Sequence, residues 1–149
     1  MLNLSRKTRL ALEAVVDVAY NARPDPVQSK DITKRQGIPQ RYLEQVMQHL
    51  VHAGILKGVR GPRGGYRLAR ERRRITLGEV VRVVDAMDDN DPEPANCSPL
   101  GEQVVRPIME DMQQEVMRRL DEITIEDLCR QAQAKGIQIA HRRNQDFEI

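Results

Sequence analysis

The segment 29–69 restricts the fold more than any other part of the chain, because two helix signals and a hairpin signal follow one another directly. A short helix is predicted over 31–36, followed by a turn at Gly37. A second helix is predicted over about 40–52, and Pro39 suits its start, because a missing N–H costs nothing in a first helical turn. This succession is typical of a helix-turn-helix, but it also fits an ordinary helical hairpin.

The second half of this segment predicts a β-hairpin. Two short apolar stretches, near 56–59 and 66–68, flank a tip that is rich in glycine and arginine. A hairpin that directly follows a recognition-type helix is a wing. Its glycines would let the backbone approach a phosphate chain, while Arg60 and Arg63 would neutralise it. A nucleotide-binding loop is excluded, because no Gly-Lys-Ser/Thr follows and the order is not strand, loop, helix.

The charge of the chain is divided unevenly between its two halves. Residues 1–75 contain 16 Lys and Arg against 6 Asp and Glu, whereas 76–149 contain 8 against 16, and the net charge is only +2. A basic N-terminal half suggests contact with a polyanion, although solvated helix faces explain the same counts.

Composition also limits the compartment and the chemistry. No apolar run approaches the roughly 18 residues of a membrane span, and two cysteines cannot form a disulfide framework. A cytoplasmic protein is therefore expected. No nucleophile–base pair, metal triad or phosphate loop stands out, so an enzyme is not expected.

The C-terminal half predicts a long helix over about 104–122, with Pro107 in its first turn. Its apolar stripe is too long for a small aliphatic core to cover, so we expect it to pair with a partner chain. The stripe consists of Val105, Ile108, Met112, Val116 and Leu120. The predicted fold is mainly α with a small β-hairpin wing: a winged helix-turn-helix plus a long dimerisation helix. Its parts are a DNA-binding domain over 1–87, an acidic effector or sensor loop over 88–101, a dimerisation helix with a capping helix over 102–136, and a polar tail over 137–149.

Three sequence motifs carry a family resemblance. They are Arg41-Tyr42-Leu43-Glu44-Gln45, then Ala53-Gly54-Ile55-Leu56, and then Arg60-Gly61-Pro62-Arg63-Gly64-Gly65-Tyr66-Arg67-Leu68-Ala69-Arg70. Together they resemble the Rrf-type family of bacterial winged-helix transcription regulators, which includes the iron–sulfur assembly, nitric-oxide-sensing and cysteine-metabolism repressors. The likeness runs from about Leu4 to Arg130, and the glycine-rich wing is its most specific part.

The resemblance implies a homodimer that binds double-stranded DNA at a palindromic operator. The recognition helix would then present Gln40, Arg41, Tyr42, Glu44 and Gln45 to the major groove. The wing would contribute Arg60, Arg63, Gly64 and Gly65, with Arg60 placed in the minor groove. Two alternatives stay open: Tyr42 as a partly packed core residue, and Glu44 as a solvated charge or a partner of a neighbouring arginine.

The chain departs from its relatives in the predicted sensor loop. Many family members hold an iron–sulfur cluster there with three closely spaced cysteines, whereas this loop has only Cys97. No cofactor is therefore expected, and a cluster would need non-cysteine ligands beside Cys97. The same residue can be a thiol sensor or an inert loop residue. Cys129 lies on an apolar helix face and is expected to be buried.

These features favour a transcription regulator, with the resemblance implying a repressor that responds to a redox, thiol or iron–sulfur signal or to a small molecule. The alternative is a protein-interaction module that acts by docking to a partner protein, and the acidic C-terminal half supports it. A gel shift with genomic fragments separates the two hypotheses.

Overall fold

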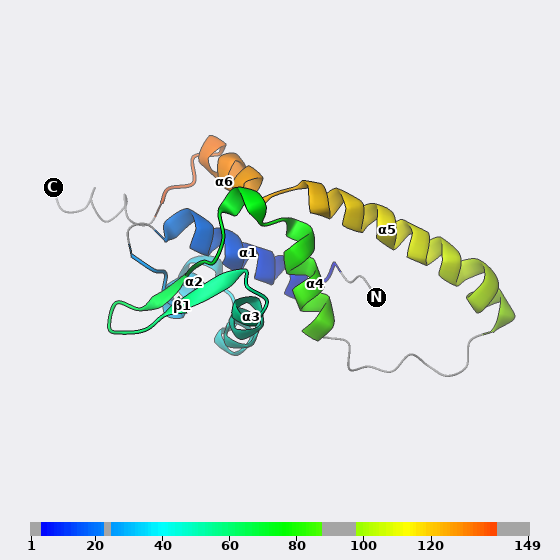
Figure 1. The fold of residues 1–149 in the computed structure, drawn as a ribbon, viewed down its shortest axis with the longest axis horizontal. Coiled ribbons are helices and arrows are strands. Elements are labelled where there is room, and N and C mark those ends of the chain that lie inside the picture. The colour runs from blue at the N-terminus through cyan, green and yellow to red at the C-terminus, as the bar shows by residue number, and fades with distance from the viewer. Residues whose placement is uncertain (1–3, 23–24, 88–97, 140–149) are drawn as a thin grey trace.

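The described residues, 4–22, 25–87 and 98–139, form a helical head with a two-stranded wing, from which one long helix projects (Figure 1). In this computed structural model the elements are α1 (Arg6–Asn21), α2 (Ser29–Gln36), α3 (Gln40–His52), β1 (Leu56–Val59), β2 (Gly65–Leu68), the 3-10 helix η1 (Arg72–Arg74), α4 (Leu77–Met87), the π-helical turn η2 (Gly101–Val105), α5 (Arg106–Glu122) and α6 (Ile125–Ala134). No described helix has the length and apolar character that crossing a bilayer requires. The predicted helical fold with a hairpin wing is confirmed.

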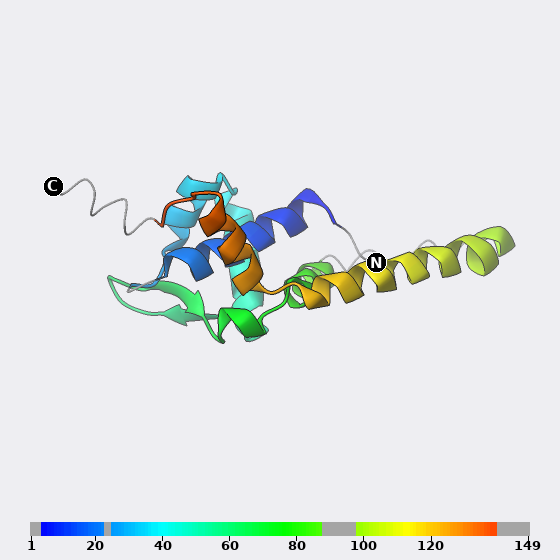
Figure 2. The ribbon, with the colours of Figure 1, turned by 90° about the horizontal axis from the view of Figure 1, so that it is seen from above.

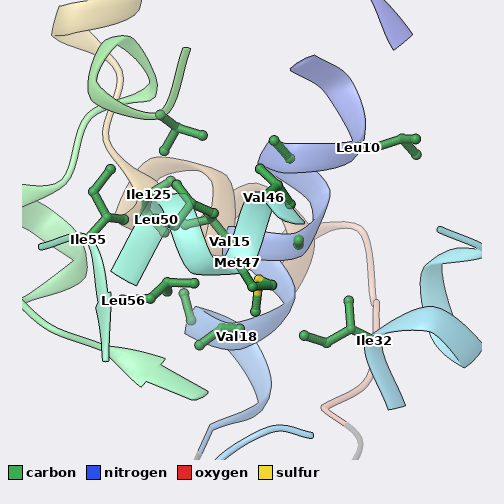
Figure 3. Packing of buried hydrophobic residues seen from close by; sticks show 14 of the residues in the cluster. Leu10, Val15, Val18, Ile32, Val46, Met47, Leu50, Ile55, Leu56 and Ile125 are labelled. Carbon is green, nitrogen blue, oxygen red and sulfur yellow. The ribbon is translucent and has the colours of Figure 1, made fainter. Parts of the chain in front are cut away.

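The core of the head is aliphatic and is built around α1 and α3. Apolar residues recur every three or four positions in both helices, which gives each one buried face. Figure 3 shows side chains from α1, α3, β1 and α6 converging on a common centre. The fully buried residues there include Val15, Val18, Leu43, Val46, Met47, Leu50, Leu56 and Ile125. This packing fixes which face of α3 remains on the surface.

The helix starts show where local sequence signals are reliable. Thr76 and Glu79 exchange hydrogen bonds between side chain and backbone at the start of α4, and Thr124 and Asp127 do the same at α6. The backbone N–H of Thr124 lowers the pKa of Asp127, because it donates to the ionised carboxylate. Ser5 behaves differently: it occupies the N-cap of α1, but its buried hydroxyl has no partner among the described residues.

Two further helices start earlier than predicted. The helix predicted over 31–36 begins two residues earlier, at Ser29, and its N-cap is Gln28. The long helix begins before residue 104, because helical turns extend from residue 99 and include the π-helical turn η2. There the N–H of Arg106 donates to the carbonyl of Gly101. A wider turn suits Pro107, which has no N–H and whose ring would crowd the carbonyl four residues earlier.

The base of α5 is fastened to the head, while the rest of the helix extends away from it (Figure 2). The N–H of Leu77 donates to Ile123 O at 2.9 Å, and the N–H of Ile125 donates to Ile75 O at 2.9 Å. Two hydrogen bonds of 2.6 and 2.8 Å join Arg82 on α4 to Asp121 on α5. The direction of α5 is therefore set at its C-terminal end.

Candidate nucleic-acid interface

The exposed face of α3 carries the side chains that were predicted to face DNA. Leu43, Val46, Met47 and Leu50 are buried, and this orientation turns the intervening polar residues outward. Gln40, Arg41, Glu44 and Gln45 are all exposed. The amide of Gln40 donates to Glu44 at 3.1 Å, one helical turn away. The first two turns of α3 thus present amide, guanidinium and carboxylate groups, which are the groups that pair with base edges.

Tyr42 occupies an intermediate position on the same helix. Its ring is half-buried against the core, and its hydroxyl donates to the carbonyl of Lys7 at 2.5 Å. This contact supports the packing role that the sequence left open. It also places the start of α1, where Arg6 and Lys7 are exposed, beside the first turn of α3. Sequence reasoning missed this basic neighbour, because 35 residues separate Tyr42 from Lys7.

The wing is an antiparallel hairpin with Leu56 opposite Leu68 and Val59 opposite Gly65. Its predicted strands are confirmed. Arg60 and Arg63 lie at the exposed tip, and neither forms an ion pair within the described part of the chain. Their guanidinium groups are therefore available to an external anion.

Gly64 and Gly65 lie so close to neighbouring backbone that neither position has room for a side chain. Gly64 is buried, and a Cβ there would lie 2.2 Å from the carbonyl oxygen of Val59. A Cβ on Gly65 would lie 2.4 Å from the carbonyl oxygen of Val27. Val27 and Tyr66 also exchange backbone hydrogen bonds of 3.0 and 2.7 Å, so the wing rests on the chain that precedes α2. The glycines shape and seat the wing, which is a different requirement from the predicted approach to phosphate.

Several other basic residues of the N-terminal half are neutralised within the chain. Glu79 pairs with Arg70 at 3.0 Å, and Glu126 of α6 pairs with Arg72. Arg73 donates to Glu71 and lowers the pKa of that carboxyl group. Glu71, Glu79 and Glu126 thus balance basic residues beyond the wing, whereas Arg60 and Arg63 at the tip form no ion pair within the described residues.

The predicted dimer stripe lies mostly in the open. Val105, Ile108 and Met112 are 50–57% exposed, Val116 is 36% exposed, and no residue of α5 is buried. Leu120 differs from the prediction, because the last turn of α5 passes the head and this side chain packs against the core of its own chain. The exposed stripe also contains Val104 and Met109, which the sequence reading omitted.

The candidate sensor and cofactor residues are divided between described and undescribed parts of the chain. Cys97, together with most of the predicted loop 88–101, lies outside the described residues. Cys129 is 3% exposed in the core, as expected. Within the described ranges, no three His, Cys, Asp or Glu side chains gather in a way that could hold a metal ion.

Comparison with known proteins places this arrangement among transcription regulators. The Rrf2 family, described as "Iron-dependent Transcriptional regulator", matches residues 4–131. The HTH-type transcriptional regulator IscR of Vibrio atlanticus (strain LGP32) is 33% identical over 150 residues, which cover 99% of this chain and 86% of that protein. The IscR of Vibrio campbellii (strain ATCC BAA-1116) is 43% identical over 88 residues, and the match spans about half of that relative, 52%.

Two solved structures extend the likeness to the fold. The T. potens IscR structure has a TM-score of 0.72 and 32% sequence identity, and the match covers 95% of this chain and 96% of that one. CymR (YrzC), the global cysteine regulator of B. subtilis, has a TM-score of 0.64 and 31% identity, covering 87% and 97% of the two chains.

Proposed function

This chain belongs to the Rrf2 family and is a DNA-binding transcription regulator, and from that premise we propose that it acts as a homodimeric repressor at a palindromic operator. The observation that carries the proposal is that an exposed polar face on α3 occurs together with two wing-tip arginines that form no ion pair within the described residues. In this arrangement α3 enters the major groove while the wing follows the neighbouring backbone. The chain is a regulator rather than an enzyme.

The proposed roles follow from the position of each side chain. Arg41 and Gln45 are exposed at the start of α3, where they can donate to base edges. Gln40 and Glu44 are already hydrogen-bonded to each other, so the two side chains together present both donors and acceptors to the base edges. Tyr42 holds the start of α1 beside the first turn of α3. Arg6 and Lys7 therefore lie next to the helix that enters the groove, where they contact phosphates rather than bases.

A gel shift with genomic fragments over a salt series tests the proposal. Binding to specific fragments is expected to weaken steeply as salt rises, because each phosphate contact releases counterions. A docking module without DNA affinity would shift no fragment. An affinity that stays constant from low to moderate salt would contradict an interface built on the wing-tip arginines.

We predict that Arg60→Ala weakens operator binding by about 1–3 kcal/mol, because a base-edge or narrow-groove contact is lost. The fold is expected to survive, since Arg60 is exposed and supports no core packing. Arg73→Ala is a matched control: Arg73 is also exposed but pairs with Glu71 beyond the wing. Equal affinities for the two variants would remove Arg60 from the interface.

The exposed stripe on α5 supports the dimer. In a monomer its apolar side chains would all face water, and an apolar patch of this kind is typical of an interaction site. Pairing two α5 helices in a symmetric dimer covers both stripes with identical surfaces. It would also carry two heads, whose recognition helices must reach sites about 34 Å apart on one face of DNA.

The cysteines of this chain are too few for an iron–sulfur cluster held by thiolates. Such clusters use several cysteine ligands, whereas this chain has two cysteines and one of them, Cys129, is packed in the core. One thiolate for each chain leaves most positions of a cluster to oxygen or nitrogen ligands. The proposed function therefore does not depend on a cluster.

Cys97 remains the candidate entry point for a redox or thiol signal, and its replacement tests this. Operator affinity of wild type and Cys97→Ser is to be measured in the reduced state and after a mild oxidant or a persulfide donor. We expect the wild type to change affinity on treatment and the serine variant not to respond. Identical behaviour of the two proteins in every condition would make Cys97 a bystander.

A further inference from the structure

A cavity of about 310 Å³ lies in the head between α1, the end of α2, α6 and the segment that follows α6. Its apolar wall consists of Leu12 and Val16 from α1 and Leu128 and Ala132 from α6. Leu12, Val16 and Leu128 are half-buried: their inner sides pack on the core, and their outer sides face the cavity. The wall is thus hydrophobic but is not closed by the chain itself.

The inner end of the cavity is polar and belongs to the helix-turn-helix. Asp17 of α1 is 2% exposed and accepts hydrogen bonds of 2.7 and 2.9 Å from Arg35 and of 2.8 Å from Gln36. Both donors are in the last turn of α2. The outer wall is fastened by the Tyr20 hydroxyl, which donates to the carbonyl of Ile137. The cavity therefore touches the helix that supports α3.

The charges around the cavity indicate which class of molecule it can take. Arg35 is paired with Asp17, and Arg9 lies 3.6 Å from Glu13. Each charged group that lines the cavity thus has an opposite charge beside it, which leaves no excess charge to hold an ion. An ionised ligand would also lose hydration against the apolar wall without gaining a partner. Asn21 and Gln36 also line this end, and each amide donates one hydrogen bond to Asp17 while carrying a second N–H and a carbonyl oxygen.

We propose that this cavity binds a small uncharged organic molecule, with its hydrophobic body between α1 and α6 and one hydrogen-bonding end toward α2, and that binding adjusts DNA affinity. The volume lies at the lower end of the usual range for small-molecule sites, about 300–1,000 Å³, so the ligand is small. A molecule seated against Gln36 presses on the turn of α2 that the Asp17–Arg35 pair fastens to α1. Because α2 packs on α3, occupancy biases how α3 is presented. The effect on DNA rests on the proposed function, whereas ligand binding does not.

The first test uses benzamide and benzoate, two molecules of the same shape that differ in charge. Each is titrated into the full ¹⁵N-labelled chain while backbone amide signals are followed by NMR. Benzamide is expected to shift signals of the lining residues, and benzoate is expected to bind at least about tenfold more weakly because its charge finds no partner. Equal binding of both, or benzamide shifts scattered away from the lining, would overturn the proposal.

Two matched variants on α6 locate the binding. Ala132→Trp fills the cavity and is expected to weaken benzamide binding at least about tenfold, whereas Ala134→Trp adds the same ring at an exposed position outside the lining. Ala132→Leu fills less space, so its affinity for benzamide should lie between those of the two tryptophan variants. This variant keeps the comparison available if Ala132→Trp is unstable. Wild-type affinity for benzamide in both Ala132 variants would overturn the proposal.

The same protein samples distinguish other occupants and the link to DNA. If benzamide binds only after residues 140–149 are removed, or only in dilute protein that has dissociated, then the chain itself or a second copy fills the cavity and the proposal fails.

Operator affinity of Ala132→Trp should differ at least about fivefold from that of Ala134→Trp, which is a typical allosteric coupling. Should wild type bind no DNA fragment, the proposed function fails while the benzamide titration still decides the cavity.

Discussion

Met112→Glu is expected to convert the protein from a dimer to a monomer in sedimentation at micromolar concentration. Met112 is 57% exposed in the middle of the α5 stripe, and a symmetric dimer would bring two such residues into one seam. An unpaired carboxylate in that seam costs several kcal/mol, so the dimer dissociation constant should rise at least about a thousandfold. Operator affinity should fall with it, because a single head reaches only one half-site.

Gln114→Glu is the matched control for this prediction. It adds the same carboxylate to the same helix, about 200° around the helix axis from Met112 at 100° per residue. Gln114 is exposed, so this variant should remain dimeric and keep its operator affinity. A Met112→Glu protein that sediments as a dimer, or a wild type that sediments as a monomer, would show that α5 does not join two chains.

Arg35→Ala is expected to lower the free energy of unfolding by about 3 kcal/mol, measured by urea denaturation. Removing one partner of a buried ion pair costs about 3–5 kcal/mol, because the other charge stays buried without compensation. The lower end applies here, since 30% of the Arg35 side chain is exposed whereas the Asp17 side chain is fully buried. Among the described residues, the Gln36 amide alone would still donate to that carboxylate in the variant.

A double variant separates this effect from a simple loss of packing. Asp17→Leu combined with Arg35→Leu removes both charges, and similar buried replacements are often neutral or stabilising. We therefore expect the double variant to be more stable than Arg35→Ala. Lys34→Ala, at the exposed neighbouring position of α2, should change stability by less than about 0.5 kcal/mol. Equal losses for the single and double variants would contradict an uncompensated charge at Asp17.

The elements of the head could be predicted from sequence because their signals are local. The three- and four-residue spacing of Leu43, Val46, Met47 and Leu50 fixes both the helix and its buried face, and the exposed face follows from it. The strands of the wing follow from two apolar stretches around a glycine-rich tip. Thr124 with Asp127 three residues later gives the start of α6 directly.

The remaining features depend on contacts between distant residues, which periodicity does not encode. Asp17 reads as a polar interruption of an apolar helix, and only the fold shows that Arg35 and Gln36 bind it. The sequence suggests that Gly65 lets the wing approach a phosphate chain, but glycine is required there because the backbone of Val27 lies so close. Leu120 shares the spacing of the α5 stripe and yet packs on its own head, because the sequence does not show where the head ends beside the helix.

The way α5 is mounted sets how accurately its base must be held. At 1.5 Å per residue its 17 residues extend about 25 Å, so a tilt of about 5° at the base moves the far end by about 2 Å. The backbone bonds at Leu77 and Ile125 and the Arg82–Asp121 pair hold only the final turns. These few contacts therefore determine the angle between α5 and the head, and that angle sets the position of the far end of α5. In the proposed dimer, weakening any of them would make the distance between the two heads less well defined without altering a residue proposed to face DNA.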